Sequence, residues 1–335
     1  MRGGVLVWLV VAFVTASASA NGRDELAAHN VKLLEHIEQV HGFTPQQMDA
    51  LRALVRNSGY MGQGNPAITE HADSRAACTT RLESESVPYA HADFERICGG
   101  KYMAPLYDPS RQSAEQARAC IDQFEFPDIP CEYPVVWVKA EEAAQVCAAI
   151  GKRLCDAHEW EGACDGALTA PDYRFDLAQG MSPEAAVARM RAAHNQAHAA
   201  SARWSYGPEF QRGVCAQAGH KSASCQGGGF EQCGSNTYPA GDFPACHSPL
   251  WVYDLNGNAA EHMNLPLNAA QMASTGSTAL GVTEMKGSWF IFDTYRAHPD
   301  WCRWRAPFWH GGRVMDPHSH ANYHLGFRCC KTLGK

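Results

Sequence analysis

The sequence has no excess of positive charge, no long apolar run after its N-terminal segment and no cysteine pair with the CxxC spacing. It contains 28 Lys and Arg against 35 Asp and Glu, so it lacks the electrostatic footprint of proteins that bind nucleic acid or an anionic membrane. Beyond the N-terminal segment, no stretch reaches the roughly 18 apolar residues that a transmembrane helix needs. The CxxC spacing of zinc knuckles and the GxSxG motif of serine hydrolases are also absent.

The composition is that of a folded protein. The chain has 335 residues, of which 45% are hydrophobic and 19% charged, and this balance excludes wholesale disorder. A chain of this length buries enough apolar surface to fold without covalent cross-links. Its 14 cysteines therefore need another explanation.

The N-terminus supplies that explanation. Arg2 precedes an apolar run over residues 5–14, and the small residues 18–20 form a cleavage site. We therefore expect residues 1–20 to be a signal peptide and the mature chain to begin at Asn21; a retained membrane anchor is the alternative. Export to the periplasm or the extracellular space favours disulfides, and an even number of cysteines suits a disulfide framework. Metal–thiolate chemistry is the rival interpretation.

Residues 21–95 are predicted to form a helical hairpin followed by an irregular segment. Thr44, Pro45 and Gln47 have the order of a capping box at the start of a second helix. Gly59 suits the end of that helix. The apolar positions of both helices are packing positions.

The middle of the chain predicts alternating short elements. Residues 133–139 resemble a strand, and residues 141–150 a helix with Ala143 and Val146 inward. Asp156 is placed to cap another short helix. An Ala-rich insertion near 167–213 contains a helical pattern over residues 182–203, and the chain after it is loop-rich.

Three segments resemble the formylglycine-generating-enzyme family, also called sulfatase-modifying factors. The first comprises YPVVWV at 133–138, GKRL at 151–154 and EWEGAC at 159–164. The second is YDLNGNAAE at 253–261, and the third runs from KGSW at 286–289 to GFRC at 326–329.

The resemblance implies an α+β fold related to C-type lectins, loop-rich, with small antiparallel sheets and disulfides. It covers residues 96–335, which we predict to be one such domain carrying the insertion near 167–213. Residues 21–95 lie outside the resemblance and precede the domain as an N-terminal helical segment.

The family's enzymes oxidise a substrate cysteine to formylglycine with oxygen and copper, which two cysteines hold. Those cysteines follow the Trp of GSW by two and seven residues, where this sequence has Ile291 and Arg296. Soft thiolates suit Cu(I), and neither Ile nor a permanent cation can replace them. The family mechanism is therefore not expected here.

The remaining pocket of the family is partly kept. The candidate pocket residues are His262, Ser288, Trp289, Tyr295 and Arg296. If the family's geometry carries over, His262 and Arg296 face one pocket and suit a carboxylate or another anion. Alternatively, Arg296 pairs with an acidic neighbour and His262 is a satisfied interior side chain.

The resemblance also implies a calcium site. Its transferred ligands are the main-chain oxygens of Asn256, Gly257 and Ala259 and the side chain of Glu261, and hard oxygen ligands suit Ca²⁺. A plain turn in which Glu261 accepts main-chain hydrogen bonds is the alternative.

Histidines are frequent, with 16 in the chain. A group before the last strand is a candidate for copper or iron: His310, His318, His320 and His324. His194 and His198 lie one helical turn apart, a spacing that can bind metal, but no third ligand is obvious from sequence. A solvated or core role is the alternative for both groups.

The resemblance pairs Cys164 with Cys329. Cys147 and Cys155 are placed for a local pair, and Cys330 with Cys302 is a further suggestion. Adjacent residues of a strand face opposite ways, so Cys329 and Cys330 should have different partners.

The leading hypothesis is an exported, non-catalytic binding or assembly module that holds a protein, peptide or small molecule in its groove. The alternative is a divergent metal-dependent oxidoreductase with histidine ligands. A third hypothesis, an oxidase of a small molecule such as a siderophore precursor, is implied only by the resemblance to relatives with this fold, and no residue of this sequence singles it out.

Overall fold

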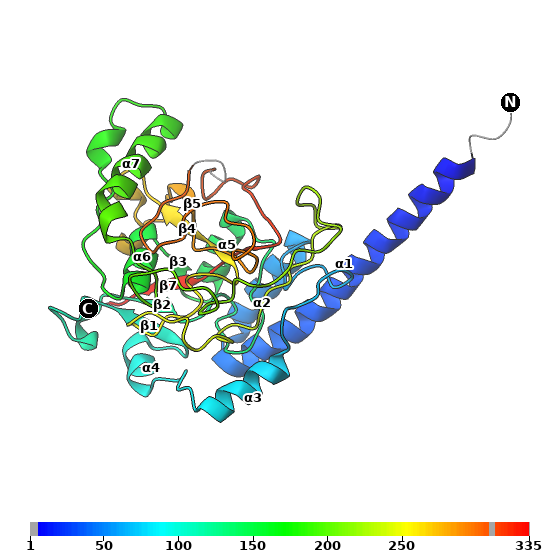
Figure 1. The fold of residues 1–335 in the computed structure, drawn as a ribbon, viewed down its shortest axis with the longest axis horizontal. Helices are drawn as coiled ribbons and strands as arrows, with labels where there is room; N and C mark the ends of the chain where they lie inside the picture. The colour runs from blue at the N-terminus through cyan, green and yellow to red at the C-terminus, as the bar shows by residue number, and fades with distance from the viewer. Residues whose placement is uncertain (1–5, 308–311, 335) are drawn as a thin grey trace.

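The N-terminal part of the first helix projects from the rest of the molecule (Figure 1). The structure, a computed structural model, describes the backbone of residues 6–307 and 312–334, with side chains from residue 22 onward in those ranges. The side chains of the predicted signal peptide all lie outside the described ones, and the signal peptide stays a prediction. Over the described residues, no helix combines the length and apolarity needed to cross a membrane.

The predicted helical hairpin is confirmed. Helix α1 (Leu6–His41) is followed by α2 (Pro45–Ser58), and Thr44 and Gln47 form the capping box at the start of α2. Gly59 ends α2 with φ 73°, a conformation that glycine adopts without a Cβ penalty. Local hydrogen-bonding chemistry thus sets both ends of the second helix.

Two small sheets form the centre of the fold. One has the order β1-β2-β7-β3 and is antiparallel; the other has the order β5-β4-β6, in which β4 pairs with β5 antiparallel and with β6 parallel. The strands are β1 (Met103–Leu106), β2 (Ala119–Asp122), β3 (Arg153–Leu154), β4 (Ala260–Leu265), β5 (Val282–Lys286), β6 (Leu325–Phe327) and β7 (Cys329–Thr332). The α+β class with small, mainly antiparallel sheets is confirmed.

Helices and loops surround these sheets. The remaining helices are α3 (Arg75–Glu85), α4 (Ala92–Cys98), α5 (Ala140–Ala149), α6 (Ala157–Asp165) and α7 (Pro183–His198). Short 3-10 helices occur at Ala114–Gln116, Phe175–Ala178, Ala199–Ser201, Ala269–Gln271 and Ala273–Thr275. The helices predicted after residue 140, at the Asp156 N-cap and in the insertion are all confirmed.

The strand predicted over residues 133–139 is wrong. The backbone of Val136 bridges to Gly62, but Val135 donates to Phe126 and Trp137 to Asn322. Trp137 also has φ 57°. Each backbone group finds a different partner, so the apolar segment is buried without a continuous ladder.

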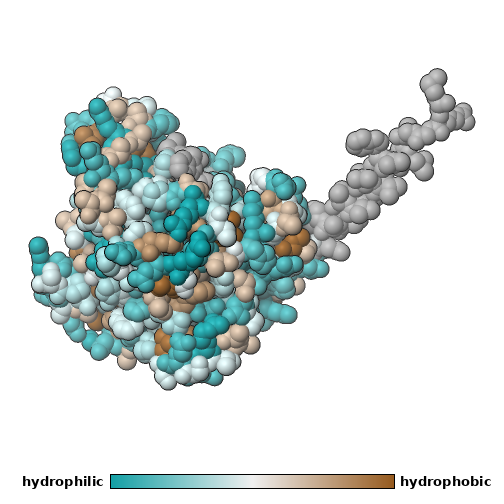
Figure 2. Space-filling view, viewed as in Figure 1, coloured by the Kyte–Doolittle hydropathy of each residue, from teal (hydrophilic) through white to brown (hydrophobic). Residues whose placement is uncertain are grey.

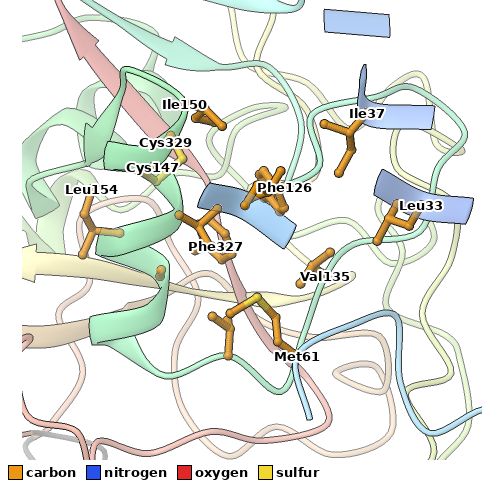
Figure 3. Close-up of a cluster of buried hydrophobic side chains, with 14 of the residues drawn as sticks. Leu33, Ile37, Met61, Phe126, Val135, Cys147, Ile150, Leu154, Phe327 and Cys329 are labelled. Atoms are coloured by element: carbon orange, nitrogen blue, oxygen red, sulfur yellow. A yellow bond between two sulfur atoms is a disulfide. The ribbon is translucent and has the colours of Figure 1, made fainter. Parts of the chain in front are cut away.

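The hairpin shares one hydrophobic cluster with the central sheets (Figure 3). Ile37 of α1 and Met48 of α2 are buried in the same cluster as Phe126 and Phe327, whose rings stack with centroids 4.9 Å apart. Burial of such side chains contributes about 2 kcal/mol each. The N-terminal hairpin therefore helps to form the core.

The molecular face in Figure 2 is mostly polar, with apolar residues in small separate spots.

All 14 cysteines form disulfides, and none is free. The seven pairs are Cys78–Cys131, Cys98–Cys120, Cys147–Cys329, Cys155–Cys330, Cys164–Cys302, Cys215–Cys246 and Cys225–Cys233. The predicted disulfide framework is confirmed.

Three predicted pairings are wrong. Cys164 bonds Cys302 rather than Cys329, and the suggested pairs Cys147–Cys155 and Cys330–Cys302 do not form. The reason is the strand register: β7 lies beside β3 and places its two cysteines against the segments that flank β3. The expectation that Cys329 and Cys330 have different partners is confirmed.

Candidate functional site

The family's copper positions carry no sulphur in this fold. Ile291 is buried in a hydrophobic cluster with Trp289 and Phe292. Arg296 is exposed, with its guanidinium carbon 3.9 Å from the Phe210 ring centroid. Since every cysteine is in a disulfide, no thiol from elsewhere in the chain can replace the missing ligands. The residues present therefore do not fit the copper centre.

Aromatic and imidazole rings gather at this place instead, and we call Trp289, Tyr295, His298 and His324 the Trp289 cluster. The Trp289 ring stacks on His324 with centroids 4.8 Å apart, and its centroid lies 6.3 Å from that of Tyr295. His298 is 5.3 Å away, with its pKa lowered by burial. Tyr295 is 61% exposed, so the cluster reaches the molecular surface.

Ser288 is turned inward, away from a surface role. Its hydroxyl donates to Asp300 Oδ2 at 3.0 Å and accepts from Gln217 Nε2 at 2.9 Å. Asp300 is buried, which raises its pKa, and it also accepts from the Trp204 indole. Ser288 thus helps to anchor the loop that carries Trp289.

His262 is a satisfied interior side chain. Its Nε2 lies 3.0 Å from the Val138 carbonyl and its Nδ1 2.9 Å from the Thr283 hydroxyl. Because a carbonyl only accepts, Nε2 carries the proton and Nδ1 accepts from Thr283. His262 therefore lies inside the β4–β5 sheet, whereas Arg296 is at the surface, and a shared anion pocket has no support in this geometry.

The loop predicted to bind calcium is held by an internal ion pair. Arg328 donates to both oxygens of Glu261, at 2.7 and 2.8 Å. The Trp160 indole also donates to Glu261, at 3.2 Å. The calcium site stays a prediction, but a guanidinium occupies the carboxylate that calcium would need, so the residues as placed do not fit the ion.

Two further carboxylates are buried near that pair. Glu125 accepts from Ala259 N–H at 2.7 Å and from Asn258 Nδ2 at 2.8 Å, and so fixes the turn of the same loop. Burial, with the nearby charges of Asp254 and Glu261, raises the pKa of Glu125 well above its usual range. Burial likewise raises the pKa of Asp254 to about 7. The loop is therefore a structural polar centre of the fold.

Asp254 should make stability depend on pH. In the unfolded chain its pKa is about 3.9, so between about pH 4 and 7 the folded protein holds a proton that the unfolded chain has lost. As the pH rises through this window, the free energy of unfolding should therefore fall by up to about 1.4 kcal/mol per pH unit. The free energy of unfolding can be measured by urea titration from pH 4 to 8 with intact disulfides. It should depend less on pH in Asp254→Asn than in the unmodified protein. Equal slopes in the two proteins would contradict the raised pKa of Asp254.

The predicted histidine group before the last strand does not converge. His310 lies outside the described residues. The His318 side chain is 91% exposed, His320 is near Asn322 at the surface, and His324 is buried in the Trp289 cluster. These four residues stay candidates only as a prediction.

A different group converges in the part of the chain that the structure describes. One ligand atom each from Asp172, His194 and His198 lies within 4.8 Å of the others. Asp172 Oδ2 is 3.0 Å from His194 Nδ1 and 2.7 Å from His198 Nε2. The two histidines were noted from their spacing, but Asp172 was missed because a lone aspartate in a loop forms no pattern with them.

The surroundings of this group are charged and buried. Glu161 lies between Arg305 and Lys286, with contacts of 2.9 and 3.0 Å. Burial raises the pKa of Glu161, but the charges of Arg305 and Lys286 outweigh it and hold the pKa well below its usual range. The same guanidinium reaches Asp172 Oδ1 at 3.1 Å.

The fold and the loop motifs together define a formylglycine-generating-enzyme-like protein. Residues 15–333 match the family model described as the sulfatase-modifying factor enzyme 1-like domain (FGE-sulfatase). The chain therefore belongs to this family. The match includes the N-terminal hairpin, which the resemblance of individual motifs left out.

Other comparisons add little. No curated protein sequence matches the chain. Among solved structures, CarF is 11% identical with a TM-score of 0.36, covering 69% of this chain and 97% of that chain. PvdO from Pseudomonas aeruginosa is 12% identical with a TM-score of 0.33, covering 69% and 91%. At these TM-scores the two similarities say nothing about function.

Proposed function

We propose that this chain is an exported member of the family that does not carry out copper-dependent cysteine oxidation and acts as a binding or assembly module. The observation that carries the proposal is the state of the cysteines: all 14 are in disulfides. Thiolates are the ligands that hold Cu(I), and a disulfide sulphur cannot supply them.

Export is supported by two features. The N-terminal segment has the order of a signal peptide, and seven disulfides are typical of proteins that fold in an oxidising compartment.

The Trp289 cluster is the surface that we propose for binding a protein, peptide or small molecule. Aromatic side chains combine a large apolar area with few rotatable bonds, and tyrosine and tryptophan are enriched at binding sites for that reason. Tyr295 presents an exposed ring beside Trp289, and Arg296 supplies a cation next to it. This combination favours an aromatic or anionic group on the partner.

The test is a direct assay for the family reaction. The purified protein, never exposed to reductant, is mixed with Cu(I), oxygen and a peptide containing one cysteine, and the peptide is analysed for an aldehyde. We expect no aldehyde above a blank without protein. Copper-dependent aldehyde formation by the oxidised protein would overturn the proposal.

A further inference from the structure

The group formed by Asp172, His194 and His198, within the insertion near 167–213, has a feature that a simple ion pair does not explain. His194 Nε2 lies 2.7 Å from the main-chain oxygen of Arg303. Since that oxygen only accepts, Nε2 must donate, and a neutral imidazole then presents its Nδ1 lone pair on the other side. That lone pair points toward Asp172.

Two acceptors therefore face each other. His194 Nδ1 is 3.0 Å from Asp172 Oδ2 but lacks the geometry of a hydrogen bond, although the His194 side chain is completely buried. Buried polar atoms are rarely left without a partner. A cation bound between the nitrogen and the oxygen would satisfy both atoms.

The neighbours orient these groups as the surroundings of a metal site do. The Arg303 carbonyl fixes the tautomer of His194, and Arg305 binds Asp172 Oδ1 at 3.1 Å, so that Oδ2 is the oxygen that faces the two histidines. Such contacts to the outer atoms of ligands are typical of metal centres. His198 adds a second imidazole from the next turn of α7, with its Nε2 2.7 Å from the same Oδ2.

We propose that Asp172, His194 and His198 bind one divalent transition-metal ion, for which zinc is the best match. Two imidazoles and one carboxylate are a ligand set of zinc sites that keep an open coordination position, whereas Ca²⁺ and Mg²⁺ require oxygen ligands. The side chains of Asp172 and His198 are 36% and 24% exposed, so the open position faces solvent. The site lies on the lobe formed by α7 (Figure 1) and is independent of the binding function proposed above.

The experiment uses the full exported chain with its disulfides intact, stripped of metal by a chelator and titrated with zinc against a chromophoric competitor. We expect one zinc per chain, with affinity at least about 100-fold weaker in His198→Gln, since a direct ligand should matter more than the 10–100-fold of an outer contact. His198 is the last residue of α7 and partly exposed, so this variant should fold. His318→Gln, at a fully exposed histidine, is the matched control and should bind as the unmodified protein does.

A second readout separates a metal site from an imidazolium–carboxylate pair. Zinc should raise the melting temperature of the unmodified protein and of His318→Gln, but not of His198→Gln or Asp172→Asn, because a ligand stabilises only the state that binds it. Cobalt should give visible absorption bands that the same two variants lose. Absence of stoichiometric zinc uptake, or uptake that His198→Gln leaves unchanged, would overturn the proposal.

Discussion

Removal of both disulfides on β7 is expected to prevent folding, while removal of either one alone is tolerated. Cys147–Cys329 and Cys155–Cys330 span 182 and 175 residues and lie side by side. With one of them intact, loss of the other reopens a ring of only about ten residues, which costs about 3 kcal/mol in the chain-entropy account.

With both removed, the chain is held at this point only through Cys164–Cys302. The reopened ring then has roughly forty residues, and the total cost rises to about 7 kcal/mol. The loss from removing both disulfides is therefore comparable to the whole free energy of unfolding of a typical domain, about 5–15 kcal/mol.

The measurement is the yield and urea midpoint of Cys→Ala pairs purified without reductant. Removal of Cys225–Cys233, which spans 8 residues, is the control and should still give folded protein. A four-alanine variant lacking both β7 disulfides that folds as stably as either two-alanine variant would contradict this account.

Replacement of Arg328 by Met is expected to lower the free energy of unfolding by about 3–5 kcal/mol, because it leaves a buried carboxylate without its partner. Arg328 is completely buried and binds both oxygens of Glu261. It also donates to three main-chain carbonyls, those of Asp122, Gln123 and Tyr253. Urea unfolding with intact disulfides measures the loss.

Two further variants make this result specific. Arg328→Met combined with Glu261→Gln should recover part of the loss, since no unpaired charge then remains. Arg174→Met is the control, because Arg174 pairs with Asp176 on the surface and such pairs contribute little. An Arg328→Met variant as stable as the control would contradict a structural role for the Glu261 pair.

Local chemistry explains which parts of the fold were predictable. The capping box at Thr44 and the Asp156 N-cap are each set by neighbouring residues, and both helices form. The strand predicted over residues 133–139 was wrong because apolar composition indicates burial, whereas a strand also needs a neighbouring strand with which to form a hydrogen-bond ladder. The disulfide pairs failed because they depend on the register of β3 against β7.

In the candidate site too, features set by local sequence were predictable and features set by tertiary packing were not. The loss of sulphur at positions 291 and 296 could be seen in sequence because a motif fixes their spacing from Trp289. The partner of Glu261 could not, since Arg328 lies 67 residues away and the pair forms only when β4 meets the end of the chain. Asp172 reaches His194 and His198 in the same way, through tertiary packing alone.

The central claim, that this family member has no thiols with which to hold copper, is tested most directly by counting them. The protein is purified without reductant, unfolded in guanidinium and titrated with a thiol reagent. The structure predicts no free thiol before reduction and 14 after it. Two reactive thiols in the unreduced protein would contradict the claim and restore a copper-binding oxidase as the better account.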